Sequence, residues 1–86
     1  MERQDIIDGL VEILRTVRMV DQAKLESVTE ETDFIADLNT PSTEMINIVS
    51  KIEQKFEVEF DDDDIDDMGS KVKDAVDLII KVKQRS

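Results

Sequence analysis

Cysteine, histidine, tryptophan and tyrosine are all absent from this chain of 86 residues. Without cysteine, neither a disulfide nor a thiolate metal site can add stability to the fold. Without histidine, the chain lacks the commonest general base and the commonest zinc ligand. A Ser–His–Asp or Cys–His catalytic group therefore cannot form within it, and we do not expect an enzyme.

Other scarcities exclude whole classes of partner. Three phenylalanines are too few to build stacking platforms for single-stranded nucleic acid. A formal net charge of −11 argues against binding to nucleic acids or anionic membranes. No apolar run approaches the roughly 20 residues that span a bilayer, and the segment MERQDII does not resemble a signal peptide. We expect a cytoplasmic protein, monomeric and without membrane insertion, folded as a single domain over residues 1–86.

The negative charge is concentrated in the middle of the chain. Residues 25–70 carry fifteen acids against only Lys51 and Lys55, a net charge of −13. Residues 1–24 have a net charge of −1 and residues 71–86 a net charge of +3. A field of this sign steers basic partners toward the central segment.

Apolar residues at helical spacing predict three longer helices. The first covers Asp5 to Val20, with Gly9 as a mild defect inside it. The second begins at Pro41 with Thr40 as its cap and ends near Phe56. The predicted core positions of the last helix are Val72, Ala75, Val76, Ile79 and Val82, and Ser70 is its expected cap.

Two segments between these helices are less regular. Residues 21–40 form a long connection whose apolar residues Phe34, Ile35 and Leu38 we expect to tuck into the core. The aspartate-rich stretch Asp61 to Asp67 is expected to form at most a short helical turn. The sequence therefore predicts an all-α protein: a small four-helix bundle with three longer helices, one short helix and a long first loop.

The aspartate run has two interpretations. It forms either a solvated acidic face or a loose, low-affinity site for divalent cations. An EF-hand is excluded, because aligning Gly69 with the required glycine puts Met68 and Ala75 where ligands must stand. We predict no dedicated metal site.

Ser42 is the candidate functional residue. A serine that follows a loop is often only a helix cap, and that explanation stays open. The alternative is that its hydroxyl carries a phosphate-linked group, which free N–H groups and the positive end of the helix dipole would stabilise. Without a neighbouring base Ser42 is a poor nucleophile, but it can be an acceptor when another enzyme activates it.

The segment FIADLNTPSTEMINIV, followed by KIEQKF, resembles the acyl carrier protein family and aligns with its sequence pattern without a gap. The family pattern is approximately F-x-x-D-L-G-x-D-S-L-D-x-V-E-L-V, with a helix end like L-E-E-x-F. The matching positions are Phe34, Asp37, Leu38, Ser42, Ile46, Val49, Ile52, Glu53 and Phe56. VKDAVDLI near the C-terminus is similar to the family's V-x-D-A-I-D-x-I, so the likeness extends over essentially the whole chain.

This resemblance implies a four-helix fold and a non-catalytic carrier. Ser42 would bear 4′-phosphopantetheine, whose thiol holds acyl groups as thioesters in a specialised fatty-acid, lipid or polyketide-type pathway. The partners would be a phosphopantetheinyl transferase and acyl-transferring enzymes with basic docking surfaces. The acids expected to meet them are Asp37, Glu44, Glu53, Glu57 and Glu59. Apolar residues of the second helix, Ile48, Val49, Ile52 and Phe56, would partly shelter the acyl chain.

The sequence departs from the family pattern beside the serine. Pro41 and Thr43 replace the usual aspartate and leucine, and Asn39 stands at the usual glycine. Asn47, Gln54 and Lys55 occupy positions where acids are common, so the acidic face is partly neutralised. These changes indicate a divergent or specialised carrier. They also leave an alternative open: an interaction protein with the same fold that carries no pantetheine.

Overall fold

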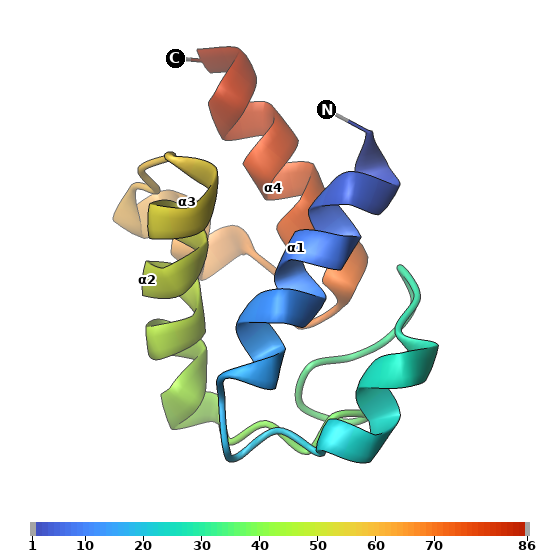
Figure 1. The fold of residues 1–86 in the computed structure, drawn as a ribbon. Helices are drawn as coiled ribbons and strands as arrows, with labels where there is room; N and C mark the ends of the chain where they lie inside the picture. The colour runs from blue at the N-terminus through green and yellow to red at the C-terminus, as the bar shows by residue number, and fades with distance from the viewer. Residues whose placement is uncertain (1, 86) are drawn as a thin grey trace.

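Four α-helices and two short 3₁₀-helices make up the fold in a computed structural model that describes residues 2–85 (Figure 1). In chain order they are α1 (Arg3–Arg15), η1 (Gln22–Ser27), η2 (Ser42–Glu44), α2 (Met45–Phe56), α3 (Asp62–Asp67) and α4 (Val72–Arg85). Residues 2–85 contain no strand; an isolated bridge pairs Asp33 with Lys71. The predicted bundle of three longer helices and one short helix is confirmed.

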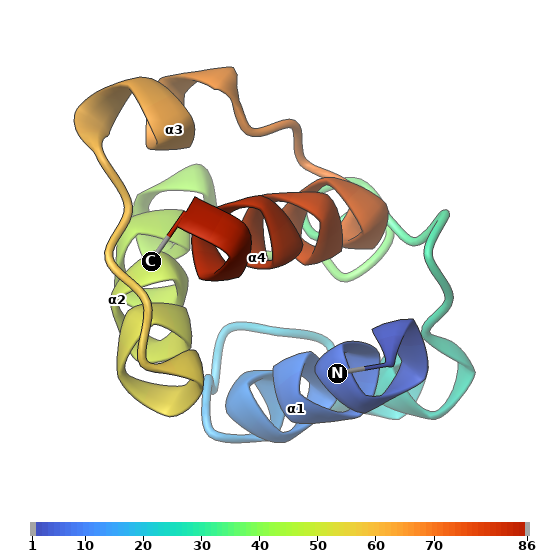
Figure 2. The same ribbon diagram turned by 90° about the horizontal axis from the view of Figure 1, so that it is seen from above.

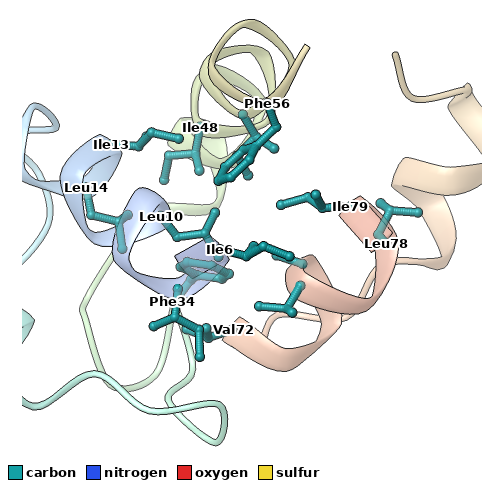
Figure 3. Packing of buried hydrophobic residues seen from close by; sticks show 14 of the residues in the cluster. Ile6, Leu10, Ile13, Leu14, Phe34, Ile48, Phe56, Val72, Leu78 and Ile79 are labelled. Atoms are coloured by element: carbon teal, nitrogen blue, oxygen red, sulfur yellow. The ribbon is translucent and has the colours of Figure 1, made fainter. Parts of the chain in front are cut away.

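The apolar faces of α1, α2 and α4 meet in one core. Figure 2 shows α4 lying between α1 on one side and α3 on the other, with α2 running across one end. Figure 3 shows Phe34 of the long connection near Ile6 and Leu10 of α1, with Ile48 of α2 and Ile79 of α4 farther along the same core. Each of these five side chains is at most 1% exposed. The core therefore holds the long connection in place as well as the helices.

The first helix ends earlier than its apolar pattern predicts. It stops at Arg15, and the Thr16 hydroxyl donates to the carbonyl of Ile13 over 2.6 Å. Val17 and Val20 are nevertheless buried, because two successive turns return their side chains to the core. The prediction of a helix up to Val20 was wrong, although the predicted burial of Val17 was right.

The long connection is only partly anchored as expected. Phe34 and Leu38 are 0% and 1% exposed, but Ile35 is 42% exposed and does not enter the core. η1 adds a short helical stretch that the sequence pattern did not predict.

Both predicted helix caps were wrong. Thr40 is buried, its hydroxyl has no hydrogen-bond partner, and Pro41 rather than Thr40 precedes the helical residues. The Ser70 hydroxyl donates to Asp33 over 2.8 Å instead of capping α4, while Asp74 accepts from the Lys71 N–H over 3.1 Å. Within residues 2–85, neither hydroxyl accepts a hydrogen bond from the start of the helix that it was expected to cap.

The aspartate run forms α3, the one short helix that the sequence predicted. Asp64 is 6% exposed, and its carboxylate accepts from the Asp61 N–H over 3.0 Å and from Arg85 over 2.6 Å. These hydrogen bonds, that of Arg85 first, hold the pKa of Asp64 below its ordinary value. One buried carboxylate thus fastens the short helix to the end of α4, while its aspartate neighbours stay in solvent.

Candidate functional site

Ser42 is exposed at the very start of the helical segment formed by η2 and α2. The Glu44 N–H donates to the Pro41 carbonyl over 2.9 Å, and the Met45 N–H donates to the Ser42 carbonyl. Within residues 2–85 the Ser42 hydroxyl makes no hydrogen bond, so this serine does not act as a helix cap. The hydroxyl therefore stands free in solvent at a helix N-terminus, where N–H groups lack helical acceptors and the dipole is positive.

The loop that leads to Ser42 is shaped by Asp33, a residue that sequence reasoning missed. One oxygen of its carboxylate accepts from the N–H groups of Ile35 and Ala36, both over 2.8 Å. The other oxygen accepts from the Ser70 hydroxyl over 2.8 Å. The bonds from Ala36 and then Ser70 lower the pKa of Asp33. An Asp in a loop, whose side chain can accept from the backbone N–H groups two and three residues on, is the available signal for such a turn.

Asn39 completes the approach to Ser42. Its φ of 58° lies in the left-handed region, which asparagine tolerates better than most residues. Asn39 thus adopts the backbone conformation for which glycine is favoured, at the position where the family pattern has glycine. The Thr40 N–H then donates to the Phe34 carbonyl over 3.0 Å, so the chain arrives at Pro41 in a defined direction.

An apolar cavity of about 170 Å³ opens next to this helix start. It lies among the loop, α2, α3 and the α3–α4 connection, and is lined by Ile35, Met45, Ile46, Val49, Ile65 and Met68, with Gly69 and Ser70. Ile46 is 74% exposed and Ile65 is 36% exposed, so the mouth of the cavity is itself apolar. Met45, the first of its α2 residues, follows Ser42 by one helical turn.

This cavity differs from the shelter expected from the sequence. Of the four α2 residues expected to line it, Val49 does so, whereas Ile48, Ile52 and Phe56 are packed in the core. Ile46 was noted only as a family match, and Ile35 was assigned to the core. An exposed apolar residue outside the buried stripe of an amphipathic helix is the signal that identifies Ile46.

The five acids expected to meet partners lie in different surroundings. The Asp37 carboxylate accepts from the Asp33 N–H over 2.8 Å, and Glu53 accepts from the Phe60 N–H over 2.9 Å. Both therefore support loops of the fold besides facing solvent. Glu44 is half-buried and accepts from the Asn47 amide over 3.3 Å.

Glu57 and Glu59 are the freer of these acids. Both are exposed, and they line one recess together with Asp61 and Arg85. Glu57 ends α2 with a φ of 56°, so the chain reverses there and presents the two carboxylates at the far end of the helix from Ser42. The acids thus form separate spots along α2 rather than one continuous stripe.

Known proteins are similar to this chain over most of its length. An acyl carrier protein from Coprothermobacter proteolyticus is 35% identical over 79 residues, covering 92% of each chain. One from Thermobifida fusca is 36% identical over 91% of this chain and 94% of its own. The chain belongs to the acyl carrier protein family.

Another member of the family is similar over nearly the full length of the chain. The meromycolate extension acyl carrier protein from Mycolicibacterium aurum is 32% identical over 98% of this chain and 82% of its own. No protein-family model matches the chain. Family membership confirms the resemblance that the sequence around Ser42 indicated.

Two further properties concern residues 2–85 as a whole. They contain no group of three or more acidic side chains placed to hold a metal ion, in α3 or elsewhere. None of their helices has the length and apolar character needed to cross a bilayer.

Proposed function

We propose that this acyl carrier protein family member carries acyl intermediates as thioesters on a 4′-phosphopantetheine arm attached to Ser42. When bound, the arm supplies the thiol that this cysteine-free chain lacks. The protein acts in a specialised fatty-acid, lipid or polyketide-type pathway as one domain over residues 1–86, in the cytoplasm. It is a carrier and not a catalyst.

The observation that carries this proposal is the free, exposed hydroxyl of Ser42 at a helix N-terminus. A phosphodiester there meets unpaired N–H groups and the positive end of the helix dipole. Loading joins the Ser42 oxygen to the pantetheine-bearing phosphorus of coenzyme A and breaks the P–O bond of the pyrophosphate bridge, which releases adenosine 3′,5′-bisphosphate. The transferase must accept the serine proton, because this chain has no histidine to do so.

The apolar cavity beside α2 supports the carrier role. Its mouth is formed by Ile46 and Ile65, and its volume is about 170 Å³. Apolar cavities of about 150 Å³ stay dry and take up a molecule the size of benzene, so this one can shelter a short stretch of acyl chain. Burial there keeps water away from the thioester carbonyl.

The acids of the central segment form the docking surface for partner enzymes with basic patches. Glu57 and Glu59, together with Glu44 near Ser42, are the direct contacts in this proposal. Asp37 and Glu53 contribute charge, but both also hold loops of the fold. Exposed pairs of this kind contribute about 0.2–1 kcal/mol each, which favours the weak and quickly exchanged complexes that a carrier needs.

The test is intact-mass measurement after incubation with coenzyme A and a broad-specificity phosphopantetheinyl transferase. We expect one added phosphopantetheine on the wild type and none on Ser42→Ala. Ser50→Ala is the matched control, since Ser50 is an exposed serine of the same helix and should leave loading unchanged.

The flanking residues motivate the alternative of an interaction protein without the arm. Thr43 is exposed beside Ser42, and Pro41 is held with φ −60° and ψ 140°. If several active transferases leave the wild-type mass unchanged while they load a family relative, the carrier proposal fails and the alternative stands.

A further inference from the structure

A groove between the C-terminal end of α1 and the outer face of α2 differs in charge from the rest of the central segment. Its lining includes Arg18, Met19, Glu44, Asn47, Lys51 and Gln54. Between Glu44 and Glu53 the sequence of α2 contains no acid. With Arg18 and Lys51 against one acid, Glu44, the lining of the groove has a net positive charge beside the acidic segment of residues 25–70.

The two cations of the groove have no carboxylate partner. Lys51 donates to the Thr16 hydroxyl over 3.0 Å, and neither Lys51 nor Arg18 forms an ion pair within residues 2–85. On the same face, by contrast, Lys55 pairs with Glu12 over 2.7 Å. Of the cations that form no ion pair within residues 2–85, Arg18 and Lys51 line this groove together, so both are available to an anionic side chain that enters it.

An exposed apolar side chain lies with these cations. Met19 is 58% exposed, and its flexible thioether suits adaptable contacts with a partner. The carbonyl end of α1 explains part of the charge, because cations near a helix C-terminus are favourable. That effect does not explain why an apolar side chain is exposed in the same groove.

We propose that this groove receives an acidic segment of a partner protein, with carboxylates against Arg18 and Lys51 and an apolar side chain against Met19. Charge complementarity selects this occupant. At 0.15 M salt the Debye length is about 8 Å, so the local cations act on a bound carboxylate while remote acids of the chain are largely screened.

The proposal goes beyond the carrier function and does not require modification of Ser42. Together with the acids at Glu57 and Glu59, it gives α2 a footprint of mixed sign. A partner with a uniformly basic docking surface would be opposed at Arg18 and Lys51, whereas one that is basic at one end and acidic at the other would fit both. Such an arrangement fixes orientation and rejects wrong partners.

The test uses the unmodified full chain and two synthetic amphipathic helical peptides. One carries glutamate and leucine at helical spacing, and the other has lysine in place of every glutamate. Each peptide is titrated at 0.15 M salt, and the backbone amide chemical shifts of the protein are monitored by NMR. The acidic peptide, but not the lysine peptide, should cause saturable shift changes at Arg18, Met19, Asn47 and Lys51.

Charge reversal supplies the second arm. R18E/K51E should weaken acidic-peptide binding about tenfold or more, because it replaces two attractive contacts by repulsive ones. K24E/K81E is the matched control: it changes the net charge by the same amount at exposed residues outside the groove and should leave the affinity within about twofold. A thermal melt of each variant establishes that it is folded.

Three results would overturn the proposal. They are the absence of saturable shifts in the groove with the acidic peptide, equal binding of the lysine peptide there, or unchanged affinity in a folded R18E/K51E. If R18E/K51E has a lower melting temperature but unchanged affinity for the peptide, the two cations serve to stabilise the C-terminal end of α1. Since no step uses the pantetheine arm, failure here leaves the mass test of Ser42 unaffected.

Discussion

Gly9 of α1 packs directly against the ring of Phe56 of α2. A Cβ atom at Gly9 would lie 2.7 Å from Cζ of Phe56, closer than real Cβ contacts allow. The glycine that looked like a defect in the first helix therefore allows a close approach between α1 and α2.

Gly9→Ala should destabilise the protein even though alanine is the better helix former. The propensity gain is about 1 kcal/mol, whereas overpacking of a core contact costs about 1–3 kcal/mol, so we expect a net loss of about 1 kcal/mol. Urea denaturation measures it. Asp8→Ala, at an exposed position of the same helix, is the control and should change stability by no more than about 0.5 kcal/mol. A more stable Gly9→Ala would contradict the packing.

Thr40→Val should stabilise the fold. The Thr40 hydroxyl is buried without a hydrogen-bond partner, and valine has nearly the same shape without a polar atom. Removing the unsatisfied group should add about 1 kcal/mol to the free energy of unfolding. Thr43→Val is the control, since Thr43 is exposed, and should be close to neutral. Loss of stability in Thr40→Val would show that the hydroxyl has a role in the folded state.

Stability should fall in acid partly through Asp33. Its pKa is lower in the folded chain than in the unfolded one, so the folded state binds fewer protons. The stabilisation is complete above about pH 5 and is lost as the pH falls below about 4 toward the folded-state pKa. Asp33→Asn should reduce stability near neutral pH and should make the melting temperature fall less steeply as the pH is lowered. If the melting temperature of this variant falls with pH as steeply as that of the wild type, other carboxylates are responsible for acid unfolding.

Ile46→Ser should impair the sheltering of an acyl group by the cavity without reducing the stability of the fold. Ile46 is 74% exposed, so the melting temperature should change little, whereas the apolar mouth of the cavity is lost. If the chain carries a six-carbon acyl thioester, its hydrolysis should be faster in this variant. Met19→Ser is a matched control at an exposed apolar residue outside the cavity and should hydrolyse at the wild-type rate. Equal hydrolysis rates in all three proteins would argue against sheltering.

The comparison of α1 with α2 shows where sequence patterns succeed. Apolar spacing identified Ile6, Leu10, Ile48 and Ile52 as core residues because burial follows helical periodicity directly. The same spacing extended the first helix too far, since Val17 reaches the core from a turn as well as it would from a helix. Periodicity reports which side chains are buried more reliably than where a helix ends.

Hydroxyl and carboxylate side chains were harder to place. Thr40 and Ser70 both stand where caps are usual, but the Thr40 hydroxyl is buried without a partner and the Ser70 hydroxyl donates to Asp33. The contact between Ser70 and Asp33 joins residues more than thirty positions apart, so no local rule could identify it.

The composition by itself determined that this protein has no thiol or imidazole chemistry of its own. The spacing of its apolar residues determined that it is helical and that Ser42 stands at the start of a helix. Long-range packing alone decided that Ile35 and Ile46 border a cavity. The physical reason is that periodicity assigns a side chain to a face of its own helix. Only the neighbouring elements decide whether other side chains pack against that face, whether it borders a cavity, or whether charged side chains lie beside it.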